Sequence, residues 1–296
     1  MNRKETITSS LNLSGLGLEV GPSHDPVAPK AGGYNVHIVD HLPQDELKAK
    51  YVGHGVNIDN IEPVDFVWAG QPLDELVGGK GIYDWIIASH VIEHVPDLIR
   101  FVRECQSILK PDGIISLAIP DRRYCFDYLR PASSTGQVIQ AHLEGRIRHT
   151  PGQIFDSFSM ATKLNGSIAW SKDSTGSLEF LHPPTFGNVM LDQYVKSDEY
   201  VDVHAWVFTP SSFRLIIRDL NELGFLNIQE ESFHDSVGCE FFVSFRNAAF
   251  SGLEDRLLLA KAAQRESSGE DAHFADAQPV LPPAGRASRW FRRGNP

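Results

Sequence analysis

Short apolar runs of strand length alternate with segments of helical periodicity over the first 120 residues of the chain. This alternation is typical of a mainly parallel β-sheet whose faces are covered by helices. The pattern predicts strands over residues 16–20, 35–39, 64–68, 83–89 and 114–119. It also predicts short helices over 43–51 and 72–77. The sequence therefore indicates an α/β fold.

The clearest helical pattern lies between the fourth and fifth predicted strands. Its apolar side chains recur at helical spacing on one face, and they are Leu98, Phe101, Val102, Cys105 and Leu109. We expect Pro111 and Gly113 to end this helix. A second amphipathic helix is expected over 211–224, followed by closing strands over 225–233 and 239–245.

The regular pattern loosens between residues 121 and 200, which we interpret as an insertion or lid on a core formed by 1–120 and 201–250. One helix is expected within 138–147, where Ile139, Leu143 and Ile147 share a face. The many aromatic side chains of the insertion predict a small hydrophobic cap, part of which would stack on a sugar-like acceptor. Residues 251–296 are expected to form a helix over 253–264 and a disordered tail from 266 onward.

Composition narrows the classes of partner. The 27 Lys and Arg residues against 38 Asp and Glu residues give a net charge of −11, which disfavours nucleic acid. Three widely spaced cysteines argue against a disulfide framework or a cysteine-built zinc site, and reduced thiols indicate a cytoplasmic location. The sequence shows neither a secretory leader nor a spanning apolar run, so no stable membrane insertion is expected. None of these features predicts the oligomeric state.

The stretch GLEVGPSHDP, residues 17–26, resembles a strand that enters a nucleotide-binding loop. Such loops usually contain several glycines, whereas Gly21 is the single glycine in this loop. Prolines at 22, 26 and 29 argue against a long helix directly after the loop. A pyrophosphate is usually bound at the N-terminus of such a helix, so a loop without the helix would bind a pyrophosphate poorly. Glu19 would suit an amine or cationic ligand, or it is a solvated carboxylate at a strand end.

Asp40 ends the second predicted strand, where a carboxylate can accept both hydroxyl groups of a ribose. NAD enzymes and methyltransferases both use an acid at this place, and a strand-end aspartate without a ligand is the alternative. The sequence lacks the full GxGxxG fingerprint, which disfavours an oxidoreductase.

The ordered motifs LEVGPSHDP, VHIVDH, YDWIIASHVIEHVPDL, ILKPDGIISLAIPD and HAWVFTPSSFRLIIRDLNELGF resemble the class I S-adenosylmethionine-dependent methyltransferases. The resemblance covers about residues 16–120 and 204–246 and is closest to bacterial members associated with surface-polysaccharide biosynthesis. It implies a Rossmann-like, mostly parallel sheet with an antiparallel last strand, and S-adenosylmethionine as the cofactor.

The same resemblance implies the cofactor-binding residues, which are Glu19, Gly21, Asp40, Val67, Trp68, Ser89 and His90. Glu19 and Gly21 would lie beside the methionine moiety, Asp40 would bind the ribose, and the turn over 67–71 would border the adenine. Ser89 and His90 would line the loop after the fourth strand. Two departures from the family pattern are the single loop glycine and Ala69, which stands where an acid often lies near the adenine.

Residues 90–94, HVIEH, match the pattern H-x-x-E-H that supplies zinc ligands in some peptidases. Zinc requires both histidines one turn apart on a stable helix, whereas Pro96 follows here and the next helix begins near Asp97. We therefore expect no metal site. Glu93 and His94 are expected instead to tie the loop to the following helix by hydrogen bonds.

A hydroxyl acceptor requires a base that takes its proton, and His142 and His204 are the candidates. A structural role is the alternative for each, and Asp121 is the remaining catalytic candidate. Arg122 and Arg123, with Tyr124, are expected to contact a phosphate or carboxylate of the acceptor, or to be solvated. The sequence favours a methyltransferase acting on a small-molecule or glycan-related hydroxyl acceptor. The alternative is a non-catalytic cofactor-binding protein on the same fold.

Overall fold

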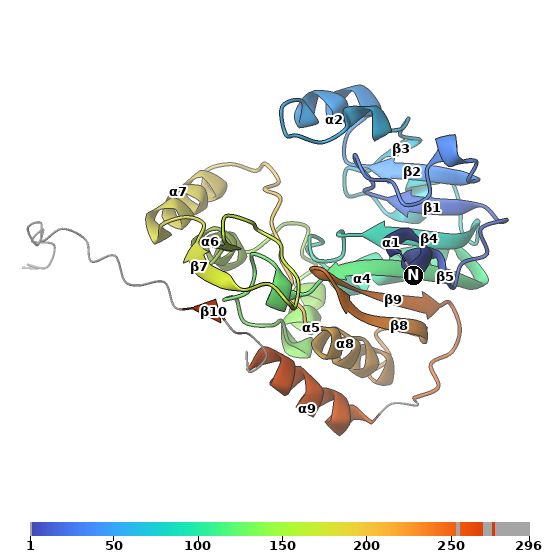
Figure 1. The fold of residues 1–296 in the computed structure, drawn as a ribbon. Coiled ribbons are helices and arrows are strands. Elements are labelled where there is room, and N and C mark those ends of the chain that lie inside the picture. Colours follow the sequence, from blue (N-terminus) through green and yellow to red (C-terminus); the bar gives the residue numbers. More distant parts are fainter. Residues whose placement is uncertain (1, 253–254, 269–273, 276–296) are drawn as a thin grey trace, which may run out of the picture.

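A seven-stranded sheet forms the centre of the computed structural model, which describes residues 2–252, 255–268 and 274–275 (Figure 1). Its order is β3 (Phe66–Val67), β2 (Val36–Asp40), β1 (Gly17–Val20), β4 (Tyr83–Ser89), β5 (Leu109–Pro120), β9 (Glu240–Arg246) and β8 (Gln229–Val237). The first five strands run parallel, and β9 is antiparallel to both β5 and β8. The fold class predicted from the sequence is confirmed.

One face of the sheet carries the main hydrophobic core, which packs against α3 (Leu73–Leu76), α4 (Leu98–Ile108), α5 (Thr135–Leu143) and α8 (Pro210–Glu222). The predicted apolar face of α4 is buried. The helix begins after Asp97, whose side chain accepts a hydrogen bond from the amide of Arg100 at 2.9 Å. It ends earlier than predicted, because Leu109 already belongs to β5.

The other face of the sheet is covered by α1 (Arg3–Thr8) and by the loop between β1 and β2. That loop forms only a short 3-10 helix, Lys30–Gly32, so the prediction that the prolines exclude a long helix here is confirmed. Gly17 is required by close packing, since a Cβ atom there would lie 2.1 Å from the ring of Trp85. Helix α2 (Gln44–Tyr51) and the 3-10 helix Ile58–Asn60 connect β2 to β3.

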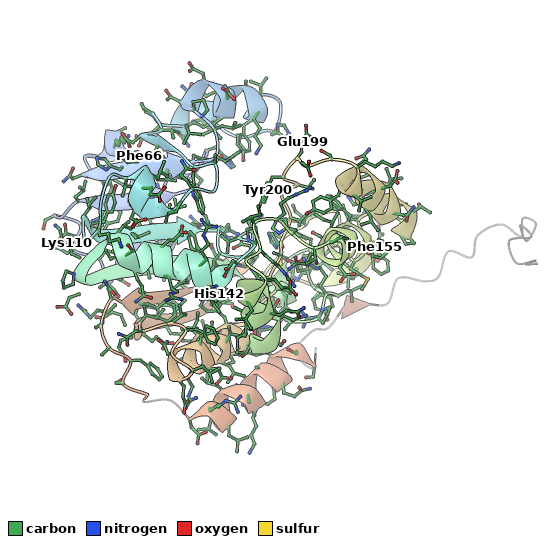
Figure 2. All side chains as sticks on the ribbon, turned by 180° about the vertical axis from the view of Figure 1, so that it is seen from behind. Phe66, Lys110, His142, Phe155, Glu199 and Tyr200 are labelled. Atoms are coloured by element: carbon green, nitrogen blue, oxygen red, sulfur yellow. The ribbon has the colours of Figure 1, made fainter. Side chains whose placement is uncertain are left out.

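The insertion after β5 contains the 3-10 helix Arg122–Tyr124, α5, α6 (Pro151–Ser159), β6 (Thr162–Leu164), β7 (Gly176–Phe180) and α7 (Pro184–Val195). Its side chains form two small hydrophobic clusters, one around Trp170 and one around Tyr194. The predicted helical face within 138–147 is wrong, because α5 ends at Leu143 and buries Val138 and Ala141. Figure 2 shows Tyr200 between the helices of the insertion and the sheet.

The carboxyl-terminal part only partly follows its prediction. Helix α9 (Arg256–Ser267) packs against α8, where Arg256 forms an ion pair with Asp219 at 2.7 Å. The predicted disorder from residue 266 is wrong for the last residues of α9 and for β10 (Phe274–Ala275), which pairs with β7. The rest of that predicted segment lies outside the described residues. In the described part of the chain, no helix is both long and apolar enough to cross a membrane.

Candidate functional site

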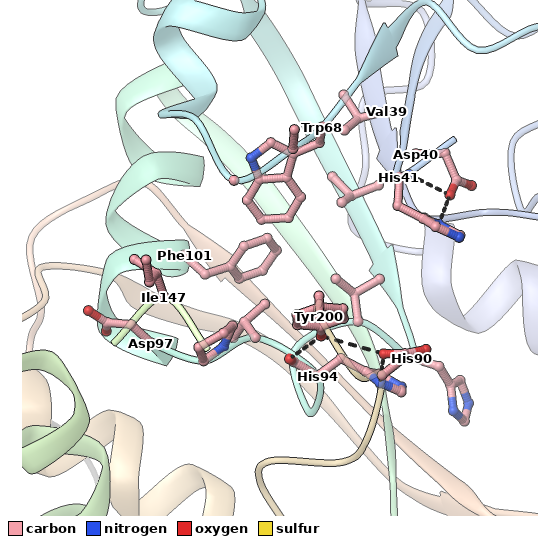
Figure 3. Close-up of a pocket in the computed structure, with 18 of the residues that line it drawn as sticks. Val39, Asp40, His41, Trp68, His90, His94, Asp97, Phe101, Ile147 and Tyr200 are labelled. Carbon is pink, nitrogen blue, oxygen red and sulfur yellow. Dashed lines mark hydrogen bonds and ion pairs between the residues drawn. The ribbon is translucent and has the colours of Figure 1, made fainter. Parts of the chain in front are cut away.

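A cavity of about 770 Å³ opens at the carboxyl edge of the sheet. Its wall contains residues that follow β1, β2, β3 and β4, together with 146–148, Tyr200 and Asp202 from the insertion and the segment after it (Figure 3). Open α/β sheets bind their ligands at this edge, and the volume is that of an ordinary small-molecule site. The cavity is therefore the candidate functional site.

The turn after β1 brings the backbone close to the cavity. Gly21 has φ +65°, and a Cβ atom there would lie 3.1 Å from Val91 Cγ2. Ser23, also at positive φ, donates its backbone N–H to Asp40 Oδ2 at 3.1 Å. Both residues line the cavity, and the turn leaves its inner side open because Gly21 has no side chain.

Glu19 lies on the opposite side of this turn. Its two carboxylate oxygens accept hydrogen bonds from the backbone N–H groups of Val27 at 2.6 Å and Ala28 at 3.1 Å. The side chain is 1% exposed, and burial raises its pKa to about 7. Glu19 is not among the described residues that line the cavity, so it shapes the loop from behind.

Asp40 and Trp68 form one end of the cavity (Figure 3). Asp40 Oδ1 accepts hydrogen bonds from the backbone N–H of His41 at 2.8 Å and its ring Nδ1 at 2.6 Å. Trp68 donates its indole N–H to the backbone oxygen of Gln71 at 2.8 Å, and its ring lies 6.0 Å from that of Phe101. Among the described residues, Val67 is adjacent but does not line the cavity.

The loop after β4 supplies His90, which has φ +54° and lines the cavity. Its Nε2 lies 2.9 Å from Glu240 Oε2 on β9. Burial lowers the pKa of His90, but Glu240 and Glu93 outweigh this effect and hold it above the ordinary value. Ser89 lies behind the wall and accepts a hydrogen bond at 2.6 Å from Arg3, which also contacts Glu240 at 2.6 Å.

The predicted acceptor-binding residues lie outside the described cavity lining. Arg123 forms an ion pair with Asp121 at 2.6 Å, and Asp121, fully buried, also accepts from the hydroxyl of Ser236 at 2.6 Å. Arg122 donates to the backbone oxygen of Tyr128 at 2.5 Å. Tyr124 packs in the hydrophobic cluster around Trp170. The arginines that do line the cavity are Arg100, Arg146 and Arg148.

His142, one of the predicted bases, lies behind the cavity wall, with its Nδ1 2.9 Å from Asp97 Oδ2. Asp97 itself lines the cavity. His204, the other predicted base, is 7% exposed, and its Nδ1 lies 2.5 Å from Asp127 Oδ2. Burial alone would raise the pKa of Asp127, but His204 and Arg130 lower it. The structure therefore places the two predicted bases apart, each beside a different carboxylate.

Glu93, His94 and His204 form a group that we call the acceptor cluster. Glu93 Oε1 lies 3.8 Å from His94 Nε2 and 3.9 Å from His204 Nε2. Glu93 is fully buried, and neither of its carboxylate oxygens has a hydrogen-bond partner among the described residues. Sequence reasoning did not find this cluster, because His204 is far from Glu93 along the chain. The expectation that Glu93 and His94 bind the following helix is wrong.

The acceptor cluster is connected to the segment after the insertion instead. His94 lines the cavity, and its Nδ1 lies 2.8 Å from Asp202 Oδ1. Burial lowers the pKa of His94, but the hydrogen bond to Asp202 and the nearby carboxylates outweigh it and raise the pKa. The backbone oxygen of Glu93 accepts from the amides of Ala205 at 2.7 Å and Trp206 at 3.1 Å. Negative charge therefore converges on the two histidines.

Comparison with known proteins places the chain among methyltransferases. A family model described as a methyltransferase domain matches residues 5–165. The ubiquinone biosynthesis O-methyltransferase of Xanthomonas euvesicatoria is 26% identical over 183 residues, which cover 60% of this chain and 69% of that protein.

Two solved structures are also similar to the chain. An S-adenosylmethionine-dependent methyltransferase from Methanosarcina mazei is 11% identical, covers 82% of this chain and 97% of its own, and gives a TM-score of 0.41. One from Aquifex aeolicus is 13% identical, with 83% and 90% covered and a TM-score of 0.40. Because the family model covers more than half of the sequence, the chain belongs to the methyltransferase-domain family and is an S-adenosylmethionine-dependent methyltransferase.

Proposed function

We propose that the protein transfers a methyl group from S-adenosylmethionine to a hydroxyl oxygen of a small-molecule or glycan-related acceptor. The observation that carries this proposal is the acceptor cluster, which reaches the cavity through His94. An oxygen acceptor is also supported by the relative from Xanthomonas euvesicatoria, whose name describes an O-methyltransferase. Membership of the family favours an enzyme over the non-catalytic alternative.

The residues at the sheet end of the cavity fit the cofactor. Gly21 leaves space that a Cβ atom would narrow, and Trp68 with Phe101 offers an apolar wall for a purine ring. Asp40 Oδ2 accepts one hydrogen bond among the described residues, from the amide of Ser23, so it retains a lone pair for a ribose hydroxyl. When bound, S-adenosylmethionine supplies a methyl group on a positively charged sulfur. We assign Gly21, Asp40, Trp68 and His90 to its binding.

The other end of the cavity would bind the acceptor. A hydroxyl group is a weak nucleophile until it loses its proton, and a positioned group that assists this loss contributes about 10²–10⁴-fold to the rate. The acceptor cluster is the group that we assign to this role, in place of His142 and Asp121. Arg146 and Arg148 lie on the wall and suit an acceptor that carries a phosphate or carboxylate. Such an acceptor would compete with Glu144 and Asp198, which form ion pairs with these arginines at 2.7 Å and 3.2 Å.

The test separates cofactor binding from transfer. Calorimetric titration of the wild type with S-adenosylhomocysteine should give measurable binding, and His94→Ala should change this affinity little. Transfer of a labelled methyl group to sugar and phenolic hydroxyls should fall by about 10²-fold or more in His94→Ala. His234→Ala, on the distant strand β8, is the matched control. Undiminished transfer by His94→Ala would refute the role of the acceptor cluster, and no binding at millimolar ligand would refute the cofactor assignment.

A further inference from the structure

The acceptor cluster brings together three atoms that can each bind a metal ion. One ligand atom from each of Glu93, His94 and His204 lies within 4.8 Å of the others. Two donor atoms about 2.1 Å from one zinc ion in tetrahedral geometry are separated by roughly 3.4 Å, and wider angles increase that separation. The distances of 3.8 Å and 3.9 Å from Glu93 Oε1 to the two Nε2 atoms are close to this value.

The outer nitrogens of the two histidines are already occupied. His94 Nδ1 contacts Asp202, and His204 Nδ1 contacts Asp127. A carboxylate that accepts from Nδ1–H fixes the tautomer in which Nε2 carries a lone pair, which is the usual arrangement around metal-binding histidines. Both Nε2 lone pairs then lie near the carboxylate of Glu93. The two Nε2 lone pairs and the carboxylate oxygens of Glu93 therefore face one another without a hydrogen-bond donor between them.

Glu93 provides an independent indication of a ligand. Burying a carboxylate without a partner costs several kcal/mol. Glu93 is fully buried, and within the described ranges both of its oxygens lack hydrogen-bond partners. Its Oε1 lies 3.5 Å from His90 Nδ1, 3.8 Å from His94 Nε2 and 3.9 Å from His204 Nε2, and none of these contacts forms a hydrogen bond. A cation bound between Glu93, His94 and His204 would satisfy these oxygens and the two nitrogen lone pairs together.

We propose that Glu93, His94 and His204 bind one divalent transition-metal ion of the zinc class. Two imidazole nitrogens and one carboxylate oxygen suit zinc, cobalt or ferrous iron better than magnesium or calcium, which prefer oxygen ligands. Three protein ligands leave a coordination position open, and His94 is the member of the cluster that lines the cavity. The open position is therefore available to the acceptor oxygen, a role that rests on the proposed function, whereas binding of the ion does not.

This ligand set differs from the H-x-x-E-H pattern of the sequence. Its first histidine, His90, uses Nε2 to contact Glu240 on β9, while its Nδ1 lies 3.5 Å from Glu93 Oε1. His90 is nevertheless outside the group of described residues whose ligand atoms all lie within 4.8 Å of one another. His204 takes its place from a distant part of the chain. The expectation of a metal-free protein rested on the unsuitable geometry of His90 and His94, and that geometry does not bear on the ligand set proposed here.

The test measures metal binding directly. Protein treated with a chelator is titrated with Co²⁺, whose visible absorption reports its coordination, and bound Zn²⁺ is counted by elemental analysis. The wild type should bind about one equivalent of either ion. Glu93→Gln, which preserves the size of the side chain, and His204→Ala should each weaken binding at least tenfold, whereas Asp127→Asn should weaken it by about 10–100-fold.

Two histidine variants and a stability measurement complete the design. His142→Ala removes a histidine that pairs with Asp97 outside the cluster and should retain the ion, as should His90→Ala. Zn²⁺ should raise the melting temperature of the wild type and not that of Glu93→Gln, which also reports whether the variant folds. No uptake by the wild type at ~0.1 mM free ion, or loss of the ion in His90→Ala, would overturn the proposed site.

The outcome for the metal is distinguishable from that for methyl transfer. Stoichiometric metal without transfer would refute the proposed acceptor and leave the ion site in place. Transfer by a chelator-treated, metal-free protein would refute the role of the ion in transfer and leave the proposed function in place.

Discussion

Protonation of His149 should destabilise the protein in mild acid. The side chain is buried, and its Nε2 lies 3.1 Å from the hydroxyl oxygen of Tyr200, which in turn donates to the backbone oxygen of His94 at 3.0 Å. Nδ1 has no hydrogen-bond partner among the described residues. A proton there would create a buried charge, and this burial lowers the pKa of His149 from 6.5 to about 4.

The size of the effect follows from the two pKa values. Below pH 6.5 His149 becomes protonated in the unfolded chain, whereas in the folded chain it stays neutral until about pH 4. The free energy of unfolding is therefore unaffected by this group above pH 6.5 and falls as the pH falls. The loss from His149 alone is about 1.4 kcal/mol at pH 5.5 and about 3 kcal/mol at pH 4.

Urea unfolding at pH 7.5, 5.5 and 4 would measure this loss. His149→Gln keeps an N–H donor for Tyr200 and does not titrate, so its free energy of unfolding should fall less than that of the wild type by the amounts given. His234→Gln, on β8, is the control and should follow the wild type. Equal losses in the wild type and His149→Gln would refute the assignment of a neutral, buried His149.

Two further variants test the cofactor end of the cavity. Asp40→Ala should weaken binding of S-adenosylhomocysteine by about 1.5–3 kcal/mol for each charge-assisted hydrogen bond lost, measured by calorimetry, and an unchanged affinity would place the ribose elsewhere. Gly21→Ala should lower the free energy of unfolding by about 1–2 kcal/mol, because alanine is strained at φ +65° and its Cβ would lie 3.1 Å from Val91. Thermal unfolding of Gly21→Ala that matches the wild type would contradict this account.

The sheet was predictable because its signals are local. Each parallel strand is a short apolar run between turns, and Asp40 ends its run directly at the carboxyl edge. The prolines after Gly21 likewise act on their own backbone, so the missing helix could be deduced. The sequence also allowed the prediction that the Glu19 side chain points away from the cavity, because side chains alternate along a strand and Val20 lies on the cavity side.

The end of the cavity that we propose for the acceptor was not predictable, because its contacts join distant parts of the chain. No spacing in the sequence relates Glu93 to His204, or His94 to Asp202. Arg123 was assigned to the acceptor from its charge, yet it forms an ion pair with Asp121, two residues before it. Whether a loop arginine contacts a ligand or a neighbouring carboxylate depends on the folded path of the loop, which composition does not specify.

Arg3, near the start of the chain, supports the loop after β4 that we assign to cofactor binding. Through Ser89 and Glu240 this arginine holds the base of the turn on which His90 sits at positive φ. Helix α1 thus stabilises one wall of the cavity through Arg3, although no residue of α1 is part of the described lining. We expect a segment fused ahead of Asn2 to disturb the contacts of Arg3, so cofactor affinity measured by calorimetry should respond to an amino-terminal purification tag more than to changes in the exposed loops around α7.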